Sequence, residues 1–352
     1  MPRDIRVQLG DNTLQRGCVI KNDEVKGRVY GNENGPAIVI LGGISASRFV
    51  ADGGKLNRGW WSTLVRPSGP IDLNKYKVIG LDFAPSTESE SRPKSITTHD
   101  QAARLKELLL LNKISNVSAI IGSSYGGMTA LAFAHDFPNM VNNICIIGAS
   151  HKPYPIGVAW RGIQRRAVLL GLEAGKPAKG MKLARELAMT TYRTAEEFDN
   201  RFNLREIQKF PSKFDICEYL GSRGDAFADL MDAERFLALS ESIDLHNIEP
   251  ELITTPTLLM SATSDQLSPL ANVRELRDRL GGVSELFTFT SLYGHDAFLK
   301  EYDAMAPRLL LLEMAKIYCI WLRQESQEGH QGGERHPRRL PLHTAREMRQ
   351  TQ

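Results

Sequence analysis

The chain has 352 residues, of which 42% are hydrophobic and 24% charged, as in a globular protein built on one large domain or on a domain with an insertion. Its formal net charge of +3 is too small to indicate a nucleic-acid partner, and its longest apolar runs are far too short to span a bilayer. The first residues contain no apolar stretch of the kind found in secretory signals, and the four cysteines are scattered without a Cys-x-x-Cys pair, which predicts a cytoplasmic protein with buried free thiols.

Short apolar segments alternate with helical ones along most of the chain. This alternation predicts an α/β fold with a mostly parallel, doubly wound sheet and helices on both faces. The spacing of apolar residues predicts helices over 101–111, 128–135 and 270–280. The predicted strands cover residues 37–41, 76–81, 117–121, 144–148, 257–260 and 285–290.

Residues 152–251 lie between the fourth and fifth predicted strands and read as a helical insertion. Amphipathic patterns predict helices over 159–170, 180–192, 195–202 and 233–242. We expect a lid over the sheet edge that excludes water from reactive intermediates, the alternative being helices that only pack on the core. The core then comprises 1–151 and 252–324, with a last helix over 303–323, and the polar segment 325–352 is expected to be a disordered tail.

Ser124 lies in a Gly-x-Ser-x-Gly motif between a predicted strand and a predicted helix. This is the sequence form of a nucleophile elbow, in which a tight strand-to-helix turn pushes the serine hydroxyl out over the sheet edge. Small residues on both sides, Gly122 and Gly126, let such a turn close. The motif alone is common by chance, so its weight comes from the flanking elements and from suitable partners further along the chain.

A serine nucleophile needs a histidine base, and the histidine needs an orienting carboxylate. His295 is the histidine that lies in a loop after the last predicted strand, and Asp265 follows the strand before it. The order serine, acid, histidine is the order that this kind of elbow predicts. A plain turn or helix-start role remains the alternative for Asp265. Asp296 is a rival acid, but adjacent side chains rarely reach the correct imidazole nitrogen.

An oxyanion hole requires two backbone N–H groups aimed at the developing charge. The residue after the nucleophile, Tyr125, is expected to supply one of them. The other is expected from the Gly-Gly-Ile-Ser-Ala loop after the first predicted strand, with Ile44 as the candidate donor and a simple tight turn as the alternative. No His, Asp or Glu spacing matches a metal site, so no metal and no cofactor are predicted.

The chain resembles the homoserine O-acyltransferases of methionine biosynthesis, the MetX-type enzymes with an α/β-hydrolase fold. The resemblance covers residues 35–322 and is most specific in the Gly-His-Asp-Ala-Phe piece and in the Ala-Arg to Thr-Tyr-Arg piece. The matching segments are Gly-Ser-Ser-Tyr-Gly-Gly-Met around Ser124, Ser-Asp-Gln-Leu-Ser-Pro around Asp265, Gly-His-Asp-Ala-Phe-Leu around His295, residues 183–193, Gly59-Trp60-Trp61 and Gly69-Pro70-Ile71-Asp72.

The resemblance implies an inserted helical lid, a homodimer formed through lid helices, and transfer of an acyl group from acyl-CoA to L-homoserine. It also implies that Ser124, Asp265 and His295 form the catalytic triad. Arg185, Tyr192 and Asp296 would hold the amino-acid acceptor. An arginine can bind an α-carboxylate through two hydrogen bonds, and an aspartate can bind an α-ammonium group.

Several alternatives remain open from the sequence. L-serine could replace homoserine, a serine esterase or hydrolase could use the same triad, and a binding protein could keep the fold without catalysis. The acyl donor is also open, because the chain departs from the family around the acyl pocket, and acetyl is favoured over succinyl. A succinyl donor needs a cation for its distal carboxylate, for which Arg48, Arg161 and Arg165 are candidates.

Overall fold

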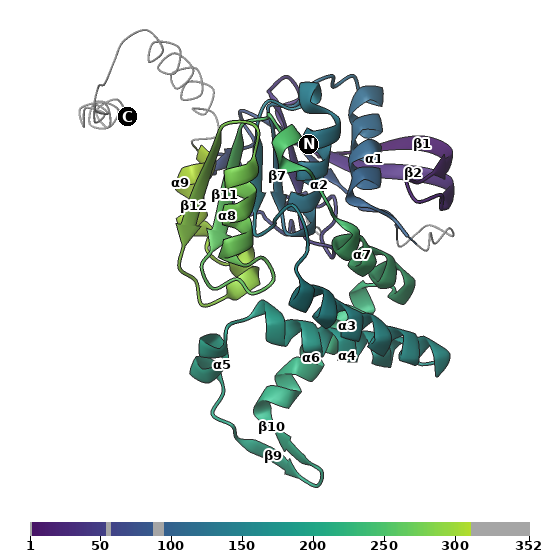
Figure 1. The fold of residues 1–352 in the computed structure, drawn as a ribbon, viewed down its shortest axis with the longest axis vertical. Helices are drawn as coiled ribbons and strands as arrows, with labels where there is room; N and C mark the ends of the chain where they lie inside the picture. Colours follow the sequence, from purple (N-terminus) through teal and green to yellow (C-terminus); the bar gives the residue numbers. More distant parts are fainter. Residues whose placement is uncertain (1, 54–57, 87–94, 311–352) are drawn as a thin grey trace, which may run out of the picture. The chain divides into compact units, whose positions relative to one another are not determined.

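An eight-stranded sheet forms the centre of the protein (Figure 1). The computed structural model describes residues 2–53, 58–86 and 95–310. Pairs from β6 to β12 are parallel, whereas β1–β2 and β2–β6 are antiparallel. The strands, in spatial order, are β1 (Arg3–Thr13), β2 (Val19–Gly31), β6 (Lys77–Leu81), β3 (Ala37–Leu41), β7 (Ala119–Ser123), β8 (Ile144–Ile147), β11 (Thr257–Ala262) and β12 (Ser284–Phe289).

All six predicted strands are present, and the mostly parallel α/β sheet is confirmed. The largest displacement is at β7, which begins at Ala119 because Val117 forms only an isolated bridge to Val141. In the sheet, β6 lies on one side of β3 and β7 lies on the other, so the strand order reverses at β3. Loops at such a reversal of strand order diverge and leave a crevice at the carboxyl ends of the strands.

Alternate residues of the strands pack on opposite faces of the sheet. Val39 and Leu41 join one core with α1 (Thr98–Leu111), α2 (Tyr125–Asp136) and α8 (Leu270–Arg279). Ile38 and Ile40 join a second core. Helices were predicted on both faces of the sheet, but the second face is covered only partly by a helix, α9 (Tyr302–Leu310). A largely irregular segment packs there as well, and it carries the short strands β4 (Val65–Arg66) and β5 (Ile71–Asp72).

The N-terminal hairpin of β1 and β2 was not predicted. It extends the parallel sheet with antiparallel strands and is tied to α1 by a buried ion pair. Arg104 Nε and Nη2 donate to the Asp23 carboxylate over 2.9 and 2.7 Å, and each side chain is 3% exposed. Asp23 also accepts a hydrogen bond of 2.8 Å from Asn12. The hairpin is therefore fixed to the core by charge as well as by backbone pairing.

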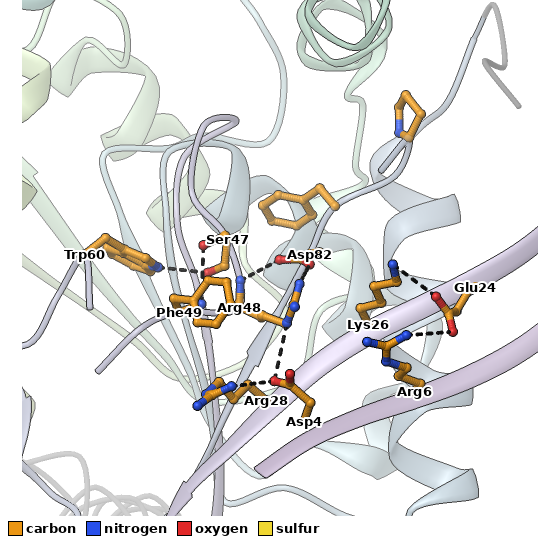
Figure 2. Close-up of polar contacts among 12 residues, drawn as sticks. Asp4, Arg6, Glu24, Lys26, Arg28, Ser47, Arg48, Phe49, Trp60 and Asp82 are labelled. Carbon is orange, nitrogen blue, oxygen red and sulfur yellow. Dashed lines mark hydrogen bonds and ion pairs between the residues drawn. The ribbon is translucent and has the colours of Figure 1, made fainter. Parts of the chain in front are cut away.

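Arg48 anchors the loop after β3 to this hairpin (Figure 2). Its guanidinium contacts the carboxylate of Asp82, which follows β6, and lies 3.5 Å from Asp4 of β1. Its backbone amide donates to Asp82 over 2.7 Å, and its carbonyl accepts from the Tyr30 hydroxyl over 3.2 Å. Side chain and backbone of Arg48 thus fix one end of the loop that starts at the carboxyl end of β3.

The segment between β8 and β11 gathers most of its helices beyond one end of the strands (Figure 1). It has an apolar cluster of its own that includes Val168, Met181, Phe227 and Phe236. The β9–β10 hairpin inside it was not predicted. The elements are α3 (Pro155–Glu173), α4 (Pro177–Tyr192), α5 (Ala195–Arg201), β9 (Glu206–Lys209), β10 (Ser212–Phe214), α6 (Asp215–Leu230) and α7 (Ala233–Leu245).

Three short 3-10 helices complete the described elements: η1 (Pro138–Met140), η2 (Pro250–Leu252) and η3 (Gly294–Leu299). The predicted last helix begins as α9, while its continuation and the predicted tail over 325–352 lie outside the described residues. No described helix combines the length and apolar character needed to cross a membrane. The thiols of Cys18, Cys145 and Cys217 are free, but Cys217 is exposed, so the predicted burial is wrong for that residue.

Asp23→Ala is expected to lower the free energy of unfolding by about 3–5 kcal/mol, because it leaves the Arg104 charge buried without its carboxylate. Urea unfolding followed by circular dichroism measures this loss. Glu33→Ala is the matched control, since Glu33 pairs with Arg3 where the two side chains are 50% and 55% exposed. Equal losses in the two variants would contradict the anchoring role of the buried pair.

Candidate active site

Ser124 occupies a strained turn between β7 and α2. Its φ of +52° and ψ of −121° are rare for a residue with a side chain. The flanking glycines are required sterically: a Cβ on Gly122 would lie 2.3 Å from the carbonyl oxygen of Gly126, and one on Gly126 would lie 2.3 Å from that of Leu41. The turn therefore has the geometry of a nucleophile elbow, and Ser124 lines a pocket.

Ser124, His295 and Asp265 form one hydrogen-bonded chain. His295 Nε2 lies 2.8 Å from Ser124 Oγ, and His295 Nδ1 lies 2.8 Å from Asp265 Oδ2. The other carboxylate oxygen accepts from the amides of Leu267 (2.8 Å) and Ser268 (2.9 Å). Asp265 follows β11, and His295 lies in η3 after β12. This arrangement can withdraw a proton from a serine hydroxyl.

The environment of His295 favours its protonated form. Burial lowers the pKa of His295, but the charge of Asp265, its hydrogen bond and the charge of Asp296 together raise that pKa above its ordinary value of 6.5. Asp296 affects the pKa of His295 only through its charge. Its carboxylate pairs with Arg193 Nε at 3.0 Å, so it is not the partner of the imidazole.

Three other histidines in the described part of the protein, His99, His135 and His246, have partners of their own. Burial lowers the pKa of His246 to about 3, and its Nδ1 lies 2.8 Å from the Thr98 hydroxyl. His99 and His135 each place Nδ1 2.7 Å from a carboxylate oxygen of Asp136. These last three residues could hold a metal ion, but they are not among the residues that line the pocket. Their spacing in the sequence did not indicate this group.

The loop after β3 lies beside the elbow. The amide of Gly126 donates to the carbonyl of Gly42, and the amide of Ala46 donates to the carbonyl of Gly43, each over 2.9 Å. A trans peptide points its N–H away from its C=O, so the N–H of Ile44 points away from Ala46. Gly43 and Ile44 both line the pocket.

Tyr125 starts α2, so its amide belongs to the free N–H groups at a helix N-terminus. Within the described part of the chain, neither this amide nor that of Ile44 has a protein hydrogen-bond acceptor. The Tyr125 side chain is fully buried, which raises its pKa to about 12. Its hydroxyl lies 2.7 Å from Ser242 Oγ of α7 and accepts from Gln101 Nε2 over 3.4 Å.

Arg235 of α7 holds the loops beside the elbow and was not identified from the sequence. Its Nε donates to the carbonyl of Pro85 over 2.8 Å, and its Nη1 donates to the carbonyl of Ile44 over 3.3 Å. The amphipathic pattern around Arg235 could not indicate these partners, because Pro85 and Ile44 lie far away in the sequence.

A pocket of about 330 Å³ opens at Ser124. Its walls come from loops at the carboxyl ends of the strands and from α3, α4, α6 and α7. The three side chains predicted to hold an amino-acid acceptor, Arg185, Tyr192 and Asp296, line this pocket together with Ser124 and His295. The structure therefore brings together residues that are widely separated in the sequence.

Arg185 and Asp296 differ in whether the protein supplies an opposite charge beside them. The Arg185 guanidinium lies 5.0 Å from the ring centroid of Tyr192 and 4.9 Å from that of Phe227. Among the described residues, no carboxylate forms an ion pair with it. Asp296 already pairs with Arg193, another residue that sequence reasoning missed.

The three arginines considered for a distal acyl carboxylate lie in different surroundings. Arg161 lines the pocket, and neither Arg48 nor Arg165 is among the described lining residues. Arg48 is engaged by Asp82, which follows β6, and by Asp4 of the N-terminal hairpin (Figure 2). The predicted role in binding a distal acyl carboxylate is therefore wrong for Arg48 and Arg165, since Arg48 pairs with Asp82 and Arg165 pairs with Asp244 away from the pocket lining.

Comparisons with known proteins show the family to which the chain belongs. The α/β hydrolase fold family matches residues 36–302. The chain is 33% identical to a homoserine O-succinyltransferase of Xanthomonas campestris pv. campestris, over 86% of this chain and 82% of that protein. It is 28% identical to a homoserine O-acetyltransferase of Carboxydothermus hydrogenoformans, over 86% of this chain and 93% of that protein. The chain belongs to the homoserine O-acyltransferase family. This result confirms the resemblance found in the sequence.

A solved structure shows the same fold in this family. The crystal structure of a homoserine O-acetyltransferase from Bacillus anthracis superposes with a TM-score of 0.81, covering 89% of this chain and 97% of that one. The two sequences are 20% identical, so the likeness shows the fold alone. The predicted α/β-hydrolase fold is confirmed.

The reactivity of Ser124 is expected to decrease as the pH is lowered, with a midpoint above 6.5. Only neutral His295 can accept the serine proton, and the pKa of His295 is raised above its ordinary value. The rate of labelling by a fluorophosphonate, measured against pH, gives this midpoint. Asp265→Asn should move the midpoint downward, because the variant removes the charge that stabilises the imidazolium. A wild-type midpoint at or below the ordinary histidine value would contradict the assignment.

Proposed function

We propose that this protein is a homoserine O-acyltransferase, which moves an acyl group from acyl-CoA to the hydroxyl of L-homoserine through an acyl-serine intermediate. The observation that carries the proposal is one pocket with two features. It is lined by Ser124 and His295, whose hydrogen bonds continue to Asp265, and by Arg185, a guanidinium with no carboxylate partner among the described residues. A hydrolase requires only the first feature, whereas transfer to an amino acid requires both.

In the first half-reaction, Ser124 Oγ attacks the thioester carbon while His295 Nε2 takes the hydroxyl proton. The amides of Tyr125 and Ile44 are proposed to bind the oxyanion, and one such donor contributes about 3 kcal/mol in related chemistry. Collapse of the tetrahedral intermediate breaks the carbon–sulfur bond. His295 delivers the proton to the departing sulfur, which leaves as free CoA thiol and leaves an ester on Ser124.

In the second half-reaction, the hydroxyl of homoserine attacks the ester carbon. His295 takes the hydroxyl proton, and the same two amides bind the second oxyanion. The bond from the acyl carbon to Ser124 Oγ then breaks, and His295 returns the proton to that oxygen. The products are O-acyl-homoserine and the free enzyme, so acyl-CoA acts as a co-substrate and no cofactor is consumed.

The acceptor is proposed to bind between Arg185 and Asp296. Arg185 is available for the α-carboxylate because no carboxylate among the described residues pairs with it, and its guanidinium lies over the rings of Tyr192 and Phe227. Asp296 would accept hydrogen bonds from the α-ammonium group while it keeps its pair with Arg193. Tyr192 lies beside both Arg185 and His295, with its ring centroid 5.0 Å from the Arg185 guanidinium carbon and 5.8 Å from the His295 ring centroid.

Release of free thiol from acetyl-CoA and from succinyl-CoA tests this proposal, with and without homoserine or serine. Homoserine-dependent release is expected, and Ser124→Ala should lower it by at least about 10³-fold. Release that needs no amino acid would indicate a hydrolase, and release driven equally by serine would indicate a broader acceptor range. No release at all would indicate a binding protein.

Arg185→Gln is expected to raise the KM for homoserine by about 10- to 100-fold, because it removes a charged hydrogen-bond partner of the acceptor carboxylate. Steady-state kinetics at saturating acyl-CoA measures this change. Lys182→Gln is the matched control on the same helix, since Lys182 pairs with Asp225 and is not among the residues that line the pocket. A similar KM in the two variants would remove Arg185 from the acceptor site.

We also propose a homodimer through the inserted helices. Large apolar side chains are exposed there, including Leu170 (65%) on α3 and Leu183 (57%) on α4. Leu170→Glu combined with Leu183→Glu should convert a dimer into a monomer in size-exclusion chromatography with light scattering. Leu111→Glu, at an equally exposed position of α1 (63%), should leave the dimer intact. A wild-type monomer would contradict the proposal.

A further inference from the structure

Two histidines and one aspartate meet between α1 and α2, outside the pocket. His99 lies in the first turn of α1, and His135 and Asp136 are the last two residues of α2. Nδ1 of His99 lies 2.7 Å from Asp136 Oδ2, and Nδ1 of His135 lies 2.7 Å from Asp136 Oδ1. The two imidazole rings are nearly perpendicular, with their centroids 5.7 Å apart. One carboxylate therefore faces two imidazoles.

His99 also has an acceptor on its other side. The hydrogen bond to Asp136 and a further one to the backbone of Asn247 both raise the pKa of His99. A hydrogen bond that raises a histidine pKa is one that the ring donates, so the acceptor is the carbonyl of Asn247. Since Nδ1 faces Asp136, Nε2 is the nitrogen that donates to Asn247.

The surroundings of His99 thus require a positive centre beside Asp136. A neutral imidazole has one N–H, and in His99 the carbonyl of Asn247 uses it. Nδ1 of the neutral ring would then direct a lone pair at a carboxylate oxygen only 2.7 Å away. This contact is favourable only when a cation lies between the two atoms, either a proton or a metal ion.

The spacing of the three side chains suits a metal ion. One ligand atom from each lies within 4.8 Å of the other two. Tetrahedral zinc with bonds of about 2.0–2.2 Å separates its ligand atoms by about 3.3 Å, so shifts of about 1.5 Å or less would bring the three atoms into place. The bond from His99 to Asn247 is the outer contact that orients a metal-binding histidine, and it leaves Nδ1 for the ion.

The types of ligand atom indicate the class of ion. Two imidazole nitrogens and one carboxylate oxygen suit Zn²⁺ and similar transition ions, whereas Mg²⁺ and Ca²⁺ prefer oxygen ligands alone. The side chains of His99, His135 and Asp136 are 20%, 22% and 25% exposed. An ion can therefore enter from solvent and keep water as a fourth ligand.

We propose that His99, His135 and Asp136 form a binding site for one zinc-class ion, with both Nδ1 atoms and a carboxylate oxygen as ligands. The ion replaces the protons between the imidazoles and the carboxylate, and these protons pass to solvent. The site joins the start of α1 to the end of α2, the helix that begins directly after Ser124. A bound ion therefore stabilises the folded core, and the site does not depend on the proposed acyl transfer.

Titration calorimetry of the full chain with ZnCl₂ tests the site. Saturable binding is expected, and Mg²⁺ should not compete for it. His99→Gln, His135→Gln and Asp136→Asn should each weaken the binding by at least about 10-fold, because loss of an outer partner alone costs about 10- to 100-fold. Saturating Zn²⁺ should also raise the Tm of the wild type and leave the Tm of these variants nearly unchanged.

Two control variants separate this site from other sources of binding. His330, His336 and His343 also carry imidazoles and lie outside the described residues. A variant with all three replaced by Gln should keep the tight binding. Asp278→Asn removes an exposed carboxylate that pairs with Arg277, and it should also bind zinc as the wild type does.

A second measurement needs no variant. Zn²⁺ should protect His99 and His135 of the wild type from diethyl pyrocarbonate, as read by mass spectrometry of peptides. Absence of saturable binding, or modification of both histidines at the same rate with and without Zn²⁺, would overturn the inference. Binding that is kept in His99→Gln and lost with the three later histidines would overturn it as well. None of these measurements uses turnover, so they decide the site whether or not the proposed function holds.

Discussion

His295 is held in place by one buried carboxylate, and the chemistry proposed for Ser124 depends on that contact. The Asp265 side chain is 2% exposed, and burying a carboxylate is costly unless N–H groups reach it. Two backbone amides and the imidazole supply them. These bonds also fix which nitrogen of His295 faces the serine. Since the amides follow β11 and the imidazole follows β12, the parallel pairing of those strands sets the geometry.

The fixed charges around the pocket bear on which substrates it favours. Asp244 is held between Arg161 and Arg165, so a carboxylate on the inserted helices is more than neutralised. Arg185 adds a guanidinium with no carboxylate partner in the described part of the protein. A pocket with an excess of fixed cations favours anionic groups over neutral ones. This bias suits substrates that carry carboxylates and serves no purpose for an ester of a neutral acid with a neutral alcohol.

The sequence predicted the elements that carry the site better than those around it. The parallel strands β7 and β11 are buried along almost their whole length and read as apolar runs, and Ser124 and Asp265 lie within three residues of their ends. The β1–β2 hairpin was missed although Ile5 and Val7 alternate with polar residues, and β9 was missed because all its residues are exposed. The contact of Arg161 with Asp244 joins residues 83 positions apart, and only the packing of α3 on α7 brings them together.

Helix α7 joins the inserted segment to the loops around the nucleophile. Arg235 donates to the carbonyls of Pro85 and Ile44, and Ser242 bonds to the hydroxyl of Tyr125. The two residues proposed to supply the oxyanion amides are therefore each held by the same helix. A displacement of α7 would disturb the pocket wall and both amides at once. Because oxyanion donors act only when they are already in place, water that entered a displaced pocket would meet an incomplete site, and the proposed transfer would be favoured over hydrolysis.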